Sequence, residues 1–258
     1  MADNDFHGFQ WSPPTCGRHF KLMPYAIVAS DGPNGLEPSM WATLGRSAQA
    51  LLPVIMRHVD ERGMAYPGEG RLAAMAGLTR KTARQAASEL EKRGLIEIRT
   101  RTSRQGRRCK SYRFKMLPGD EGILMPSIFI DGGNWHCLRP TSKSLAVALR
   151  LFAKPRPDLD PAFDDDLHNY GSWLDGDSED WREYLEQRQF DFCNAEPGVL
   201  RDFSGIGSRT YSDALADLEE HSFIAPDPDR DDYWRVMVWP QYVQRVAYLN
   251  AKISGEGW

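Results

Sequence analysis

Residues 71–115 read RLAAMAGLTRKTARQAASELEKRGLIEIRTRTSRQGRRCKSYRFK, and this stretch decides the fold. Its first residues place apolar side chains at helical spacing, and Gly77 supplies the left-handed residue that commonly ends a helix. Thr79 follows, and its hydroxyl can accept the hydrogen bond that caps a second helix. The pattern therefore predicts two short helices, 71–77 and 79–93, joined by a tight turn.

The second of these helices has two chemically distinct faces. Small or apolar residues recur at spacings of three and four, and they predict an inward face made of Ala83, Ala86, Ala87 and Leu90. The outward positions carry cationic or hydrogen-bonding side chains, namely Arg80, Lys81, Arg84, Gln85 and Ser88. Because the inward side chains are small, the helix can pack closely against its neighbours.

The hydrophobic period changes from helical to strand-like after Gly94. A strand begins at Leu95, a turn contains Gly106, and residues 109–115 alternate back as a second strand. The hairpin has one acid, Glu97, and eight cations, namely Arg99, Arg101, Arg104, Arg107, Arg108, Lys110, Arg113 and Lys115. Such a one-sided charge indicates a polyanionic partner.

Two helices followed by a basic hairpin resemble a winged helix-turn-helix. In this resemblance 71–77 is the first helix of the motif, 79–93 is the recognition helix and 96–115 is the wing. A pattern seen in bacterial regulators and replication proteins is matched by Thr82, Leu90, Glu91, Gly94, Leu95 and Ile96. The resemblance implies DNA binding, with wing arginines on phosphates or in a narrow minor groove.

The DNA contacts are predicted from the chemistry of the major groove, where Arg or Lys can pair with guanine and Gln with adenine. The recognition-helix candidates are Thr79, Arg80, Lys81, Arg84, Gln85 and Ser88, of which Arg80, Lys81, Arg84 and Gln85 are the candidates for base contact. The wing candidates are Arg99, Arg101, Arg104, Arg107, Arg108, Lys110 and Arg113. The alternative interpretation is a solvated basic face that binds nothing, as most runs of charge are.

The net charge of −4 conceals opposite charges in the two halves of the 258-residue chain. Residues 1–118 hold 19 Lys and Arg against 10 Asp and Glu, whereas residues 119–258 hold 13 against 26. The first half suits a polyanion, and the second would be repelled by one.

We expect a cytoplasmic protein. The first residues, MADNDFHGFQW, carry acids and no cationic lead before an apolar run, so no signal peptide is predicted. No stretch approaches the roughly 18 apolar residues that a membrane span needs. The four cysteines, Cys16, Cys109, Cys137 and Cys193, lie far apart, which is typical of reduced thiols rather than of a disulfide framework or a zinc site.

Three blocks of the second half repeat blocks of the first half in the same order. The triplet Leu-Met-Pro occurs at 22–24 and again at 124–126. At an offset of 94 residues, Trp41, Leu44, Ser47 and Leu51 are matched by Trp135, Leu138, Thr141 and Leu145. At an offset of 128, Leu72, Gly77, Thr82, Ala86, Leu90, Glu91 and Ile96 are matched by Leu200, Gly205, Thr210, Ala214, Leu218, Glu219 and Ile224.

These blocks predict a duplicated unit. The change of offset gives the second copy 34 additional residues, which lie roughly within 154–194. Within that insertion, the spacing of apolar residues predicts a helix over 179–192.

The second copy lacks the cationic face of the first. Its helix at 208–221 offers Arg209 and Ser212 outward but also Asp213 and Asp217, and the hairpin that follows is acidic at 226–232. We expect a structural or partner-binding role for this copy, because phosphates would be repelled there.

No catalytic, cofactor or metal motif stands out, so we expect no enzyme, no cofactor and no metal site. His136 and Arg139 have the His-x-x-Arg spacing of tyrosine recombinases, but Trp135 and Leu138 belong to the repeat, so packing explains the segment more simply. The acids at 164–166 could bind a divalent ion, but a solvated loop explains them without a second patch of ligands.

We therefore expect a helix-dominated α+β fold with two tandem winged-helix domains related by internal duplication. The expected parts are a flexible arm at 1–20, a basic domain at 21–118, an acidic domain at 119–240 with its insertion near 154–194, and a C-terminal helix and tail at 241–258. Tandem winged helices resemble initiator proteins of plasmid and phage replication. That resemblance implies binding of origin repeats in double-stranded DNA, with a second copy or a replication protein as partner of the acidic domain.

The alternative function is a transcriptional regulator that dimerises on a palindromic operator. A third function, an interaction scaffold that reads no DNA, is disfavoured by the basic hairpin.

Overall fold

The computed structural model describes residues 20–24, 27, 38–60, 62–102, 108–115, 122–131, 133–153, 190–227 and 231–237. The expected N-terminal arm, most of the acidic insertion, the tip of the wing and the C-terminal helix lie outside these residues. No helix in the described part of the chain is long and apolar enough to cross a membrane.

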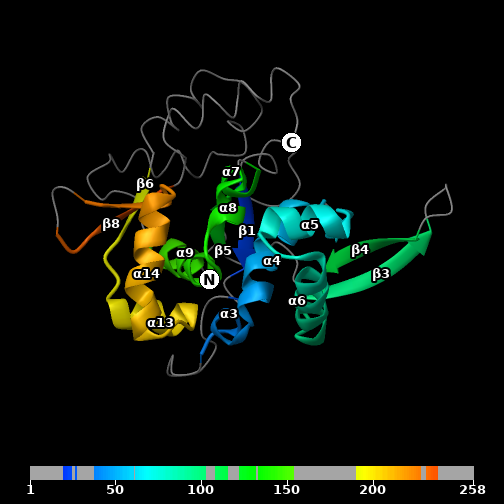
Figure 1. Ribbon diagram of the computed structural model, residues 1–258, viewed down its shortest axis with the longest axis horizontal. Coiled ribbons are helices and arrows are strands. Elements are labelled where there is room, and N and C mark those ends of the chain that lie inside the picture. The colour runs from blue at the N-terminus through cyan, green and yellow to red at the C-terminus, as the bar shows by residue number, and fades with distance from the viewer. Residues whose placement is uncertain are drawn as a thin grey trace, which may run out of the picture.

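The fold is a helix-dominated α+β arrangement, and its first half carries the basic stretch (Figure 1). The elements of this half are β1 (Phe20–Pro24), α3 (Met40–Thr43), α4 (Arg46–Arg57), β2 (Met64–Ala65), α5 (Glu69–Ala76), α6 (Arg80–Lys92), β3 (Ile96–Thr102) and β4 (Arg108–Phe114). The last three of its strands form an antiparallel sheet in the order β2-β4-β3.

The second half follows almost the same order of elements. They are β5 (Gly122–Pro126), α7 (Ser127–Asp131), α8 (Asn134–Cys137), α9 (Pro140–Phe152), β6 (Phe190–Cys193), α13 (Pro197–Ser204), α14 (Ser208–Glu220), β7 (Ile224–Pro226) and β8 (Trp234–Met237). Its three-stranded antiparallel sheet has the order β6-β8-β7, which corresponds strand for strand to that of the first half.

The two Leu-Met-Pro segments pair with each other. Strands β1 and β5 form a two-stranded antiparallel sheet whose central pair is Leu22 opposite Leu124. The buried apolar residues of both halves also belong to one continuous cluster, which runs from Met23 to Val236. The halves therefore share a sheet and a hydrophobic core.

The helices of the basic stretch form for the local reasons that the sequence indicates. Gly77 has a φ of +66° and ends α5, and the Thr79 hydroxyl accepts a hydrogen bond from the Thr82 backbone N–H at 3.1 Å. The small inward face of α6 is buried as predicted, at Ala83, Ala86, Ala87 and Leu90. This face packs against α4, so α6 is held by the core along its length.

Two buried tryptophans join the halves by reciprocal hydrogen bonds. The Trp41 indole N–H donates to the Ser144 carbonyl in α9 at 3.2 Å, and the Trp135 indole N–H donates to the Ala50 carbonyl in α4 at 2.9 Å. Both indoles are fully buried, and each N–H would otherwise be an unsatisfied donor in the core. Helices α4 and α9 pack against each other between these bonds.

The turn between α5 and α6 and the turn between α13 and α14 each lie against the other half of the chain. A Cβ atom at Gly77 would overlap the backbone oxygen of His136, and one at Gly205 would overlap the backbone oxygen of Ala42. The Lys143 ammonium, which is fully buried, donates to the Ala76 carbonyl at 2.9 Å and so caps the last turn of α5. The second half thus supports the turn that precedes α6.

The helix predicted over 179–192 is wrong at its C-terminal end. Phe190–Cys193 forms strand β6, which pairs with β8. The sequence Phe-Asp-Phe has the period of two that a strand requires, and aromatic residues favour strands. The rest of the predicted helix lies outside the described residues.

Replacing Gly77 by Ala should destabilise the protein more than replacing Gly94 by Ala. Both glycines have positive φ, so each substitution costs roughly 1 kcal/mol of backbone strain. A Cβ at Gly94 would have no atom within 4 Å, whereas one at Gly77 would collide with backbone. We expect a loss of about 3 kcal/mol or more in the free energy of unfolding for Gly77→Ala, measured by urea denaturation. Equal losses at the two positions would contradict the contact with His136.

The burial of Lys143 predicts a pH-dependent stability. Burial lowers the pKa of Lys143 from 10.5 to about 8, although Asp217 and Cys137 oppose this shift. Between these two pKa values the unfolded chain binds more protons than the folded chain, so stability rises with pH in that window.

The measurement compares wild type with Lys143→Met, both in a Cys137→Ser background so that no neighbouring thiol contributes. The difference in free energy of unfolding, wild type minus variant, should increase by about 2 kcal/mol from pH 8 to pH 10. A difference that stays constant or falls would show that the ammonium is not desolvated.

Candidate nucleic-acid interface

The outer face of α6 is polar and open to solvent. Arg80, Lys81, Arg84 and Gln85 are exposed, and Ser88 is half-buried further along the helix. Thr79 is exposed as well, but its hydroxyl already caps α6 and lies 2.8 Å from the Thr82 hydroxyl. Thr79 therefore has a structural task at this position, whereas the four exposed side chains can meet a ligand.

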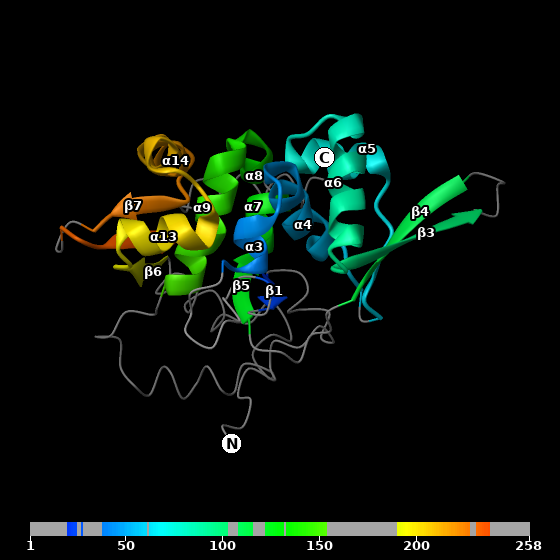
Figure 2. The same cartoon turned by 90° about the horizontal axis from the view of Figure 1, so that it is seen from below.

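The wing extends away from the helices beside α6, as two views of the molecule show (Figure 1, Figure 2). Its strands are antiparallel, with Arg99 opposite Ser111 and Arg101 opposite Cys109. Because side chains alternate between faces, Arg99 and Arg101 share one face of the hairpin with Arg113. Lys110 lies on the other face, which also carries the buried Tyr112.

Some of the predicted wing residues cannot be placed. Arg104 and Arg107 lie outside the described residues, and Arg108 is placed only by its backbone, opposite Thr102 at the start of β4. The described part of the wing therefore carries four of the seven predicted cations with their side chains, namely Arg99, Arg101, Lys110 and Arg113.

Internal carboxylates neutralise part of this basic surface. Glu69 in α5 contacts two cations. Its Oε2 lies 2.7 Å from Arg84 Nε, and its Oε1 lies 2.8 Å from Lys110 Nζ. Glu97 pairs with Arg99 at 2.7 Å within β3. These pairs are accessible to solvent, so each is of modest strength and can be exchanged for a phosphate.

The remaining cations keep the surface open to an anion. Within the described part of the chain, Arg80, Lys81 and Arg113 form no ion pair, and all three are exposed. Arg101 is exposed too, and its guanidinium lies 4.4 Å from the centre of the Tyr66 ring. A polyanion would thus meet unpaired cations on both α6 and the wing.

The sequence did not reveal the roles of Tyr66 and Glu69. Tyr66 is 46% exposed and forms a cation–π contact with Arg101. A lone aromatic residue in the polar segment before α5 is a weak signal. Its partner lies on a different element, so no local pattern connects the two residues.

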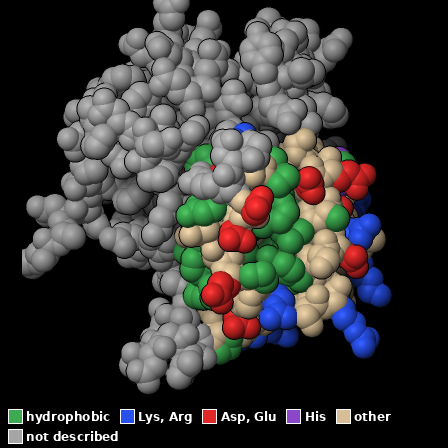
Figure 3. All heavy atoms as spheres, turned by 90° about the vertical axis from the view of Figure 1, so that its left-hand side faces the viewer, with side chains coloured by type: hydrophobic (Ala, Val, Ile, Leu, Met, Phe, Trp, Pro, Cys, Tyr) green, Lys and Arg blue, Asp and Glu red, His purple; other side chains and the backbone are tan. Residues whose placement is uncertain are grey.

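The corresponding helix of the second half, α14, presents a different surface. Arg209 and Ser212 are exposed there, but so is Asp213, whereas Asp217, which we expected to face outward, is buried. Figure 3 shows the face that carries α13 and α14, where carboxylates surround apolar side chains and the Lys and Arg side chains lie toward the edge. Among the described residues, this face has no open cationic surface like that of α6.

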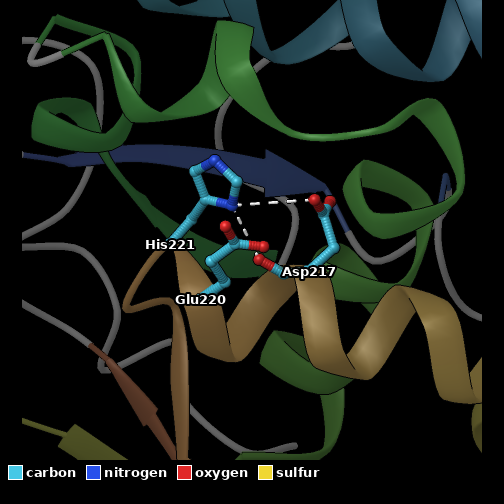
Figure 4. Close-up of side chains that lie close together, drawn as sticks. All are labelled: Asp217, Glu220 and His221. Carbon is cyan, nitrogen blue, oxygen red and sulfur yellow. Dashed lines mark hydrogen bonds and ion pairs between the residues drawn. The ribbon is translucent and has the colours of Figure 1, made fainter.

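One group in the described residues could be considered as a metal site, and it consists of Asp217, Glu220 and His221 near the end of α14 (Figure 4). Asp217 and His221 already have protein partners. Asp217 accepts a hydrogen bond from the Arg139 backbone N–H at 2.9 Å and faces the Arg139 guanidinium at 3.7 Å. His221 Nδ1 lies 2.8 Å from the Asp217 backbone oxygen, a contact that requires the proton on Nδ1. The group therefore fits a cap for α9 better than a metal site.

The acids at 164–166, which the sequence offered as another candidate ion site, lie outside the described residues.

The comparison with known families agrees with this geometry. Residues 42–96 match a family model described as a helix-turn-helix domain, and this range covers the second half of α3 together with all of α4, α5 and α6. No curated protein matches the chain, and no solved structure does either. The chain therefore contains a helix-turn-helix domain, which supports DNA as the partner of the surface formed by α6 and the wing.

Proposed function

We propose that the protein binds a specific site in double-stranded DNA through α6 and the β3–β4 wing. One observation carries the proposal: the exposed face of a core-packed helix bears Arg80, Lys81, Arg84 and Gln85 next to a basic hairpin. The major groove admits such a helix, and these side chains have the donors that read guanine and adenine. The protein acts by binding and performs no catalysis.

We further propose that the two halves are duplicated winged-helix units. Several contacts support this relation, because they recur at offsets of 94 and 128 residues. The Gly45 backbone N–H donates to Glu89 at 2.7 Å, and the Arg139 backbone N–H donates to Asp217 at 2.9 Å in the matching position. The reciprocal tryptophan bonds and the equal order of the two sheets follow the same relation.

The proposed duplication gives the halves different tasks. The basic unit, 21–118, holds the DNA. The acidic unit, 119–240, supports the helix-turn-helix and offers its own surface to a second copy or to a replication protein. The positions of α14 that match Arg80, Lys81, Arg84 and Gln85 hold Ser208, Arg209, Ser212 and Asp213. A net loss of three positive charges on that face explains why only one unit suits a polyanion.

Among sequence-specific DNA-binding proteins, we propose a replication initiator of plasmid or phage type that binds origin repeats. The tandem arrangement and the basic recognition helix support this choice. The second candidate is a transcriptional regulator that uses the acidic unit to dimerise on a palindromic operator, and the same basic helix supports it.

Genomic footprinting of the protein on its native DNA tests the proposed function. Protection of several direct repeats would support the initiator, and protection of an inverted repeat overlapping a promoter would favour the regulator. Protection of no discrete site would contradict sequence-specific binding altogether.

Matched substitutions in the two units should have unequal effects. Lys81 and Arg209 occupy corresponding exposed positions of α6 and α14. Because Lys81 contributes to a basic surface and Arg209 stands beside Asp213, Lys81→Ala should weaken duplex binding roughly 10- to 100-fold. Arg209→Ala should change affinity by less than about twofold, in the range of solvated surface charges.

The affinities are measured by fluorescence anisotropy on the footprinted duplex at a fixed salt concentration. Equal losses for the two variants would mean that both units hold the DNA.

A further inference from the structure

Glu69 occupies a central position between the two DNA-binding elements. It is the first residue of α5, and its two carboxylate oxygens contact cations on different elements. Oε2 lies 2.7 Å from Arg84 Nε in α6, and Oε1 lies 2.8 Å from Lys110 Nζ in β4. A single carboxylate thus connects the recognition helix to the wing.

This carboxylate is ionised at neutral pH. The hydrogen bond from Lys110, together with that from Arg84, lowers the pKa of Glu69 although burial opposes the shift. The position of Glu69 in the first turn of α5 also favours a negative charge, because the backbone N–H groups of that turn point toward it.

The contact with Glu69 orients the Arg84 guanidinium. Arg84 is 60% exposed, and its only hydrogen bond within the described residues runs from Nε to Glu69. Because Glu69 contacts Nε, the Nη edge of the Arg84 guanidinium keeps a parallel pair of donors for another ligand. That edge of a guanidinium matches guanine O6 and N7 in the major groove.

We propose that Glu69 is a specificity-determining positioning residue, which holds Arg84 so that its Nη edge reads a guanine. This inference rests on the proposed DNA binding and deepens it by naming the base and the residue that orients its reader. Glu69 also repels the phosphate backbone. It therefore weakens binding to DNA of any sequence while it strengthens discrimination at one base pair.

The test uses full-length protein and a duplex selected by the wild-type protein from a randomised pool. Each base pair of this duplex is replaced in turn, and guanines are replaced by 7-deazaguanine, which lacks N7. Arg84→Ala should reduce discrimination at one G·C pair by roughly 10- to 100-fold. Glu69→Gln should lose most of the discrimination at the same pair, while its affinity for a scrambled duplex stays equal or rises.

The control is Glu97→Gln. Glu97 is paired with a different candidate DNA-binding cation, Arg99, and it forms no ion pair with α6 within the described part of the chain. This variant should also bind scrambled DNA equally well or better, but it should keep full discrimination at the guanine. The comparison separates the effect of orienting Arg84 from the effect of removing one negative charge.

A double-mutant cycle completes the test. In an Arg84→Ala background, Glu69→Gln should produce no further change in discrimination at that pair. In the free protein, the NMR signal of the Arg84 Nε–H group should shift in Glu69→Gln and stay unchanged in Glu97→Gln.

Wild-type binding that selects a site, with discrimination unchanged in Glu69→Gln, would overturn the positioning role and leave the proposed function intact. The positioning role would also be overturned if Glu69→Gln reduced discrimination further in the Arg84→Ala background. Failure of the wild-type protein to select any duplex would overturn the proposed function and this inference with it.

Discussion

The structure depends on the packing of two buried tryptophans across the middle of the molecule. Each indole N–H finds its acceptor in the long helix of the opposite half, Trp41 on Ser144 and Trp135 on Ala50. Since an unpaired indole donor is costly in an apolar core, neither half can bury its tryptophan in this way without the other. This constraint fixes α4 against α9 and brings the turns at Gly77 and Gly205 onto the opposite half.

The consequence for function is that the basic recognition helix is supported from behind by the acidic half. Gly77 lies on the His136 carbonyl, and Lys143 caps the last turn of α5. Helix α6 starts three residues after Gly77, so its outer face is held at a defined angle to the core. Pre-organisation of this kind lowers the entropic cost of binding, because the reading helix need not be ordered by the DNA. Under the proposed function, the acidic half therefore contributes to DNA binding without contacting a phosphate.

Much of the basic half could be predicted because its signals are local. The alanine stripe of α6, the Thr79 cap and the left-handed Gly77 each depend on residues a few positions apart, and the structure confirms all three. The repeat offsets also identified Trp41 and Trp135 as related positions. What they could not reveal is that the two Leu-Met-Pro segments pair with each other, because equal sequence does not indicate whether two segments touch.

The contacts that could not be predicted join side chains on different elements, which become neighbours only in the folded chain. Glu69 reaches Arg84 and Lys110 on two other elements, and no periodic pattern encodes such a contact. Tyr66 and Arg101 are likewise neighbours only after the wing has folded back beside the segment that precedes α5. The C-terminal end of the helix predicted over 179–192 was wrong, because the helical spacing of apolar residues continued into the short alternating strand β6.

The central claim is that positive charge on α6 and the wing holds a DNA duplex while the matching surface of the second half does not. Mapping of backbone amide chemical shifts, as the selected duplex is titrated into the labelled protein, tests this claim most directly. The account predicts that the largest changes fall on residues 79–88 and 99–113, and that residues 208–216 change little. Largest changes on α14, or equal changes on α6 and α14, would contradict it.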